Sequence, residues 1–213
     1  MKVDYEIVEK LGEIPTGNLC DALGKKNNMR HDLKPIYSGA RVWGTAVTVR
    51  CPVADNLTIH KAMETAGEGD VLVVNAGDYK NAGLFGEVMA VSCQAKGIAG
   101  AIIDGGCRDA KEMAEMKFPV FSSAINPGGT VKESLGDVNV PIQCGGVAVN
   151  PGDIIVGDDD GVVSIPPERA EEVLEKAQGI IEKEERFFVD LKKGKDTMEV
   201  LGFNEILKKK GLL

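Results

Sequence analysis

The stretch IAGAIIDGGCRDAKEM, residues 98–113, decides the fold class. It begins with a short apolar run that ends at Asp104, continues through two glycines, and enters a segment with helical spacing at Asp109. A short apolar run closed by glycine is typical of a buried strand, and the segment after it predicts a helix. The stretch therefore predicts a strand–turn–helix unit whose turn, at Arg108 and Asp109, is open and accessible.

The same alternation continues on both sides of this stretch. Strands are expected at residues 40–52 (with Gly44 as a bulge), 69–77, 98–106 and 119–125. Helices are expected at residues 3–12, 16–24, 55–66, 84–97, 109–116 and 167–194. Strands that alternate with helices predict right-handed crossovers and a parallel sheet.

After Pro127 the pattern changes to short strands rich in valine and isoleucine, separated by Gly, Pro and Asp turns over residues 138–167. We therefore expect an α/β fold with a parallel-sheet βαβ core. A small antiparallel, barrel-like β section of the swivelling β/β/α type follows the core, and a long helix ends it. The whole chain, 1–213, is expected to form one domain that includes a C-terminal helical arm at 167–213.

The composition limits the function. The chain has 213 residues, is 43% hydrophobic, and carries a formal net charge of −8, so it offers no basic surface for nucleic acid. No apolar segment approaches the roughly 20 residues that cross a bilayer. The charged N-terminus does not resemble a signal peptide, so we expect a cytoplasmic protein without nucleic-acid or membrane partners.

Several short motifs are candidates for chemistry. The five cysteines are scattered and never form a CxxC pair, which predicts reduced thiols without a zinc site. Cys107 stands beside Arg108, which would favour a thiolate, but a small residue packed at a turn is the alternative we favour. The acids in GDDDG, residues 157–161, lack the spacing of a calcium loop and are typical of a β-turn. No phosphate-binding glycine motif is present in the sequence.

Arg108 and Asp109 are the stronger candidates. They follow a strand of the expected parallel sheet, at the edge where ligands bind in open α/β sheets. Asp109 and Glu112 also nearly form a capping box, so Asp109 could instead cap its own helix. Position alone leaves both explanations open.

A second loop, NAGLFGEVMA at residues 81–90, also joins a buried strand to a helix. Its tip is therefore expected to share the sheet edge with Arg108 and Asp109. It offers the carboxylate of Glu87 after Gly86, and the backbone N–H groups of Val88 and Met89 in the first helical turn. Such free donors suit a carboxylate ligand.

With these loops in place, the sequence resembles the class II pyruvate aldolases that cleave 4-hydroxy-4-methyl-2-oxoglutarate and 4-carboxy-4-hydroxy-2-oxoadipate. Their superfamily includes the regulator of ribonuclease E activity A. The resemblance covers nearly the whole chain. It is carried by DNLTIHKAMETAGEGDVLVVNAGD, GLFGEVMAVSCQAKGIAGAIIDGGCRD, GGVAVNPGDIIVGDDDGVVSIPPERAEEV and the glutamate-rich helix that ends in LKKG. The aldolase pattern is an acid, twenty residues, then Arg-Asp; here the acid is Glu87, where the family typically has aspartate.

The resemblance implies a site for a small oxo acid. It implies that Asp109 binds Mg²⁺ or Mn²⁺ directly and that Glu112 does so through a water. It also implies that Arg108 holds the keto or enolate oxygen, which needs stabilising when a pyruvate enolate forms. The N–H groups of Val88 and Met89, after Gly86, would hold the carboxylate, and Glu87 would orient or deprotonate the water that takes the C4 hydroxyl proton.

Further expectations concern the assembly and the reaction. The resemblance implies that Glu184, on the long helix, enters the site of a neighbouring subunit in a homotrimer or hexamer. The same enolate would allow decarboxylation of oxaloacetate. The alternative is a non-catalytic regulatory protein like the ribonuclease E regulators, which by the same resemblance tend to lack Asp109, the acid at 87 and the C-terminal arm.

Overall fold

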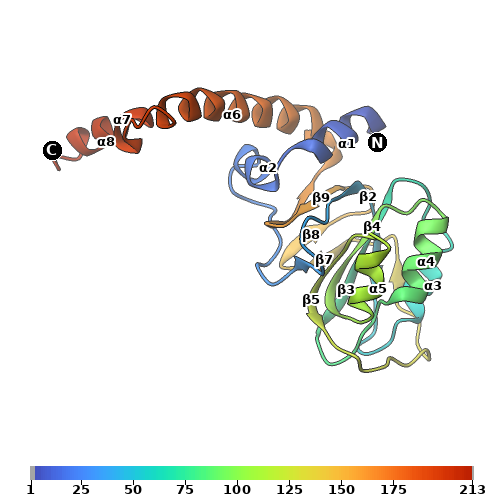
Figure 1. The fold of residues 1–213 in the computed structure, drawn as a ribbon. Helices are drawn as coiled ribbons and strands as arrows, with labels where there is room; N and C mark the ends of the chain where they lie inside the picture. The colour runs from blue at the N-terminus through green and yellow to red at the C-terminus, as the bar shows by residue number, and fades with distance from the viewer. Residues whose placement is uncertain (1–2, 213) are drawn as a thin grey trace.

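The computed structural model of the protein describes residues 3–212 (Figure 1). The strands are β1 (Lys34–Pro35), β2 (Val42–Arg50), β3 (Asp70–Tyr79), β4 (Gly100–Cys107), β5 (Val120–Ile125), β6 (Asp137–Val138), β7 (Ile142–Cys144), β8 (Val147–Val149), β9 (Ile154–Asp158) and β10 (Gly161–Ile165). The helices are α1 (Tyr5–Glu13), α2 (Thr16–Ala22), α3 (Leu57–Ala62), α4 (Glu87–Ala95), α5 (Ala110–Glu115), the 3₁₀ turn η1 (Pro167–Arg169), α6 (Ala170–Leu191), α7 (Thr197–Val200) and α8 (Phe203–Lys209).

The parallel core is confirmed. Strands β2, β3, β4 and β5 are neighbours in one sheet, each parallel to the next. Helices α3, α4 and α5 are the crossovers between them, and Figure 1 shows them together beside the strands. Because the connection runs from strand to helix to strand, the carboxyl ends of β3 and β4 lie at the same edge of the sheet.

Most of the antiparallel strands extend this sheet, whereas β7 and β8 form a separate two-stranded sheet. β9 pairs with β2, β10 pairs with β9, and at the other end the short strand β1 pairs with β5. Lys34, in β1, donates a hydrogen bond to the carbonyl oxygen of Asp160 at 2.6 Å, next to β10. The two ends of the sheet thus approach each other, and the sheet is a nearly closed barrel, which confirms the expected α/β fold class.

The parallel strands are buried on both faces. In β3, Val71 and Val73 point into the barrel interior, whereas Leu72 and Val74 belong to the core under α3, α4 and α5. Strands buried on both faces have continuous apolar runs, which explains the sequence pattern of residues 69–77.

Gly44 is not a bulge, and that expectation was wrong. It pairs in regular register with Ile155 of β9. A Cβ atom at this position would lie 2.1 Å from the carbonyl oxygen of Gly69, so the glycine permits a close backbone approach between β2 and the turn before β3.

The C-terminal arm extends away from the sheet (Figure 1). The first half of α6 packs its buried side chains Val173 and Ala177 against the core formed with α1 and α2. Further along, Phe188 is 51% exposed. No helix within residues 3–212 combines the length and apolar character needed to span a membrane.

Candidate active site

Arg108 and Asp109 follow β4 directly, and the loop before α4 is held beside them. The N–H of Arg108 donates to the carbonyl oxygen of Phe85 at 2.9 Å, and the N–H of Leu84 donates to that of Gly106 at 2.8 Å. These bonds continue the sheet pairing beyond β3. The expectation that the two loops share one edge of the sheet is therefore confirmed.

Two glycines allow this close approach. A Cβ atom at Gly83 would lie 2.6 Å from the Cβ atom of Arg108. A Cβ atom at Gly86 would lie 2.5 Å from Oδ2 of Asp109. Only glycine fits at either position without displacing the neighbouring side chain.

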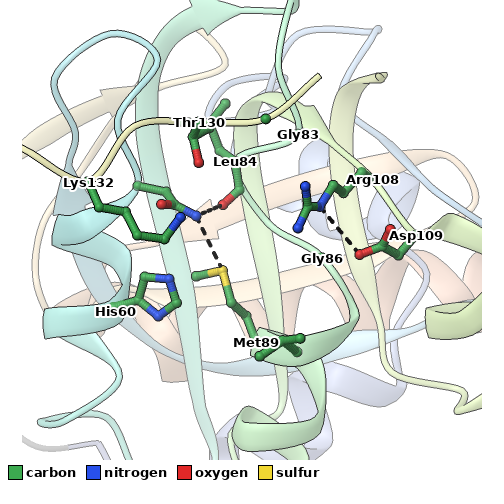
Figure 2. Close-up of a pocket in the computed structure, with 12 residues that line it drawn as sticks. His60, Gly83, Leu84, Gly86, Met89, Arg108, Asp109, Thr130 and Lys132 are labelled. Atoms are coloured by element: carbon green, nitrogen blue, oxygen red, sulfur yellow. Dashed lines mark hydrogen bonds and ion pairs between the residues drawn. The ribbon is translucent and has the colours of Figure 1, made fainter. Parts of the chain in front are cut away.

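Asp109 does not cap its own helix, so that alternative was wrong. The residue has φ 56° and ψ 40°, in the left-handed region, and its side chain makes no capping hydrogen bond to α5. Instead, Oδ2 accepts a hydrogen bond at 3.1 Å from the N–H of Glu87, the first residue of α4. The same oxygen lies 3.5 Å from Nε of Arg108 (Figure 2). The carboxylate therefore faces Arg108 and the neighbouring helix.

Arg108 and Asp109 line a cavity of about 210 Å³ (Figure 2). The lining comes from α3, the loop before α4, the start of α4, the end of β4 and the loop after β5. The lining residues are Asn56, His60, Gly83, Leu84, Gly86, Val88, Met89, Arg108, Asp109, Gly129, Thr130 and Lys132. Four of the predicted site residues other than Asp109 are thus brought together: Gly86, Val88, Met89 and Arg108.

Only one of the two expected backbone donors lacks a partner among residues 3–212. The N–H of Met89 donates to the carbonyl oxygen of Gly86 at 3.0 Å, so the expectation of a free amide is wrong there. Helices often tighten their first turn in this way. No such bond forms from Val88 to another described residue, so its N–H remains a possible donor to a ligand.

The three predicted glutamates lie outside the cavity lining. Glu87 and Glu112 are exposed on the first turns of α4 and α5. Glu184, on the distal part of α6, accepts a hydrogen bond from the side chain of Asn18 at 2.8 Å. Within residues 3–212, no three His, Cys, Asp or Glu side chains gather as a metal-binding cluster. A metal in this site would therefore depend on Asp109 as its direct ligand within one chain.

The sequence interpretation missed one end of the cavity. Asn56 and His60 lie four residues apart at α3, and Lys132 comes from the loop after β5. Burial, followed by the charge of Lys132, lowers the pKa of His60 below its usual range. Spacing of four residues places two side chains on one helix face. That spacing was the available signal for Asn56 and His60, whereas nothing local indicated Lys132.

Two other motifs are structural. Cys107 is fully buried and its burial raises the pKa of the thiol, so the interpretation as a packed small residue is confirmed. The GDDDG motif forms the turn between β9 and β10, also as expected. Its Asp158 carboxylate accepts hydrogen bonds from the backbone N–H and the hydroxyl of Thr16, at 2.9 and 2.6 Å.

Comparison with known proteins shows the family of the chain. Residues 16–164 match the family described as "RraA-like: Aldolase/RraA". The chain belongs to this family. A curated relative from Halalkalibacterium halodurans, named "Putative 4-hydroxy-4-methyl-2-oxoglutarate aldolase", is 38% identical over 83% of this chain and 84% of its own.

Solved structures support the fold, and they also include regulatory proteins. An uncharacterized protein from Pseudomonas syringae has a TM-score of 0.86 at 24% identity, covering 95% of this chain and 96% of its own, which shows the shared fold. RraAS2 from Streptomyces coelicolor, titled an unusual member of the RNase ES inhibitor RraA family, has a TM-score of 0.78 at 29% identity. That match covers 87% of this chain and 96% of RraAS2, so it includes part of residues 167–213. The presence of the C-terminal arm therefore does not distinguish an aldolase from a ribonuclease regulator.

Proposed function

We propose that this protein is a divalent-metal-dependent lyase that cleaves a 4-hydroxy-2-oxo di- or tricarboxylic acid and releases pyruvate. The observation that carries the proposal is the Asp109 carboxylate, which turns away from its own helix and faces Arg108 in a shared cavity. The name of the relative from Halalkalibacterium halodurans supports the same reaction class.

The donors around Asp109 fit Mg²⁺ or Mn²⁺. The carboxylate is 36% exposed, and only Oδ2 takes part in its hydrogen bond to Glu87. Mg²⁺ often uses one or two carboxylates and keeps several waters. Asp109 would hold the ion directly, and Glu112, three residues on, would hold it through a water. When bound, the ion supplies positive charge that stabilises an enolate.

The remaining residues would bind the substrate and move a proton. Arg108 donates to the 2-oxo oxygen, whose negative charge grows as the C3–C4 bond breaks. The Val88 N–H donates to the C1 carboxylate. A water oriented by Glu87 takes the C4 hydroxyl proton, C4 becomes a carbonyl, and the electrons of the broken bond pass to the pyruvate enolate. A proton from that water then adds to C3 of the enolate and gives pyruvate.

The long arm suggests how Glu184 could take part. It projects from the sheet body in one chain (Figure 1), and Glu184 does not line that chain's own cavity. We propose that the chain forms a homotrimer or hexamer in which the arm brings Glu184 to a neighbouring site. Decarboxylation of oxaloacetate, which yields the same enolate, is the proposed second activity.

The test is release of pyruvate from 4-hydroxy-4-methyl-2-oxoglutarate and from oxaloacetate, with and without EDTA. We expect turnover that EDTA abolishes and Mg²⁺ or Mn²⁺ restores. Asp109→Ala should remove the activity while circular dichroism remains unchanged, and Asp158→Ala should keep it. Full activity of Asp109→Ala would contradict the metal assignment.

A second candidate is binding without catalysis, favoured by the similarity to RraAS2, a member of the RNase ES inhibitor RraA family. It predicts no pyruvate release from either substrate by the folded protein with any of the divalent metals added.

A further inference from the structure

A buried side-chain amide lines the cavity at the end next to α3. Asn56, just before α3, is 6% exposed and lines the cavity. Its side-chain NH₂ donates to the carbonyl oxygen of Leu84 at 2.9 Å and lies 3.8 Å from the sulfur of Met89. The dashed lines that end on Leu84 and Met89 in Figure 2 mark these contacts.

The other half of this amide has no partner. Oδ1 of Asn56 is buried, and no donor among residues 3–212 forms a hydrogen bond to it. The amide cannot simply be reversed, because the Leu84 carbonyl only accepts hydrogen bonds and would then face another acceptor. The group left over is therefore an acceptor that requires a donor, and an unsatisfied buried acceptor costs about 1–3 kcal/mol.

The surrounding hydrogen bonds hold the segment that carries Asn56 in place, and the bond to Leu84 orients its side chain. Its N–H donates to the carbonyl oxygen of Val131 at 3.3 Å. The neighbouring Asp55 carboxylate accepts hydrogen bonds from the N–H groups of Glu133 and Ser134 at 2.8 and 2.7 Å. The loop after β5 is thus fastened over the start of α3, and a molecule in the cavity can supply the missing donor.

We propose that Asn56 determines specificity by accepting a hydrogen bond from a hydroxyl group that the ligand carries beyond its 2-oxo acid unit. The inference rests on the proposed function, in which the 4-hydroxy group is such a donor. In the bound substrate the hydroxyl hydrogen points to Asn56, and it turns to the water oriented by Glu87 before the C3–C4 bond breaks. A site built around a buried hydrogen-bonding group discriminates strongly against a ligand that lacks the matching group, because the buried group then stays unpaired. Asn56 therefore selects 4-hydroxy-2-oxo acids over 2-oxo acids of the same length.

The experiment compares two ligands that differ only in this hydroxyl, 4-hydroxy-2-oxoglutarate and 2-oxoglutarate. Each is measured as a competitor of oxaloacetate decarboxylation, by wild-type protein and by Asn56→Leu. We expect the wild type to prefer the hydroxylated ligand at least about fivefold, the ratio that corresponds to 1 kcal/mol. Asn56→Leu should reduce this preference ratio to near one, because leucine cannot accept the hydrogen bond. Any change in packing weakens the binding of both ligands alike and therefore cancels from the ratio.

Two further variants keep the test decisive. Asn56→Ser, which is smaller and polar, replaces Asn56→Leu if the latter does not fold. Thr58→Val is the matched control, because Thr58 accepts a hydrogen bond from Gly136 in the same loop without lining the cavity, so its ratio should stay as in the wild type. No preference in the wild type, or an unchanged ratio in both Asn56 variants, would overturn the inference.

Failure of the proposed function remains distinguishable from failure of this inference. A wild-type protein that releases no pyruvate from any substrate would contradict the lyase activity. Titration calorimetry with the same two ligands would then measure the same ratio of dissociation constants, and the same two outcomes would decide the role of Asn56.

Discussion

Two glycine-containing turns that carry aspartates follow strands of the same sheet, and they use their carboxylates differently. In the turn between β9 and β10, Asp158 accepts two hydrogen bonds from Thr16 and one from the N–H of Asp160. Asp159 accepts from the N–H of Gly39 at 2.8 Å and from the hydroxyl of Ser38 at 3.5 Å. After β4, the Asp109 carboxylate accepts a single hydrogen bond within the described part of the chain, from Glu87, and faces a cavity and an arginine. The number of acids in a motif therefore says less about chemistry than the number of donors that already satisfy them.

A large effect is also expected at the arginine that Asp109 faces. We predict that Arg108→Lys lowers kcat for pyruvate release more than about 10-fold, because a compact ammonium replaces a planar guanidinium that holds an oxygen with several donors. Steady-state kinetics with oxaloacetate measure it. A near-normal kcat in the lysine variant would contradict the role of Arg108 at the enolate oxygen.

A substitution in the turn between β9 and β10 should lower the stability of the protein and leave its activity unchanged. Asp158→Ala removes the acceptor for the first N–H of α2, and loss of such a cap costs about 1–2 kcal/mol of stability. Urea unfolding should show this loss, while kcat stays within about twofold of the wild type. A large fall in kcat with unchanged stability would show that the two turns do not differ as described.

A third carboxylate, that of Asp55, extends the comparison to the pH dependence of stability. Burial alone would raise the pKa of Asp55, but hydrogen bonds from the N–H groups of Leu57, Glu133 and Ser134 outweigh it, and the pKa lies below the usual range. A lowered pKa stabilises the folded state above the unfolded pKa of about 4, and this contribution is lost as the pH falls through the folded pKa.

We therefore predict that Asp55→Asn is less stable than the wild type at pH 7 and that the difference shrinks below about pH 4. Thermal unfolding across this pH range is the measurement. A difference in stability that does not change with pH would show that the Asp55 charge does not fasten the loop after β5.

Much of the fold follows from local pattern. The parallel strands were predictable because their apolar runs end in glycine or polar turns, and α6 because it begins after prolines and ends before Gly194. The strand β1 was not predictable, since it has two residues, one of them Pro35, and no apolar pattern. Its pairing with β5 depends on closure of the sheet, which is a long-range property.

The site residues also divide into those that local sequence pattern predicts and those that it does not. Arg108, Asp109 and Val88 were predictable because they follow strands whose order could be inferred. Lys132 was not, since its position beside Asn56 depends on hydrogen bonds that join Asp55 to residues 78 and 79 positions away in the chain. The lack of a hydrogen-bond donor to Oδ1 of Asn56 among residues 3–212 follows from the three-dimensional structure alone.

The most direct test of the central claim is binding of Mn²⁺ to the purified protein, followed by electron paramagnetic resonance of the free ion. Loss of groups that only support a metal ligand typically weakens affinity about 10–100-fold, so we predict that Asp109→Asn weakens Mn²⁺ binding by at least about 10-fold. Asp158→Asn, the matched change in the other turn, should bind Mn²⁺ like the wild type. Equal Mn²⁺ affinity in the wild type and Asp109→Asn would contradict the assignment of Asp109 as the metal ligand.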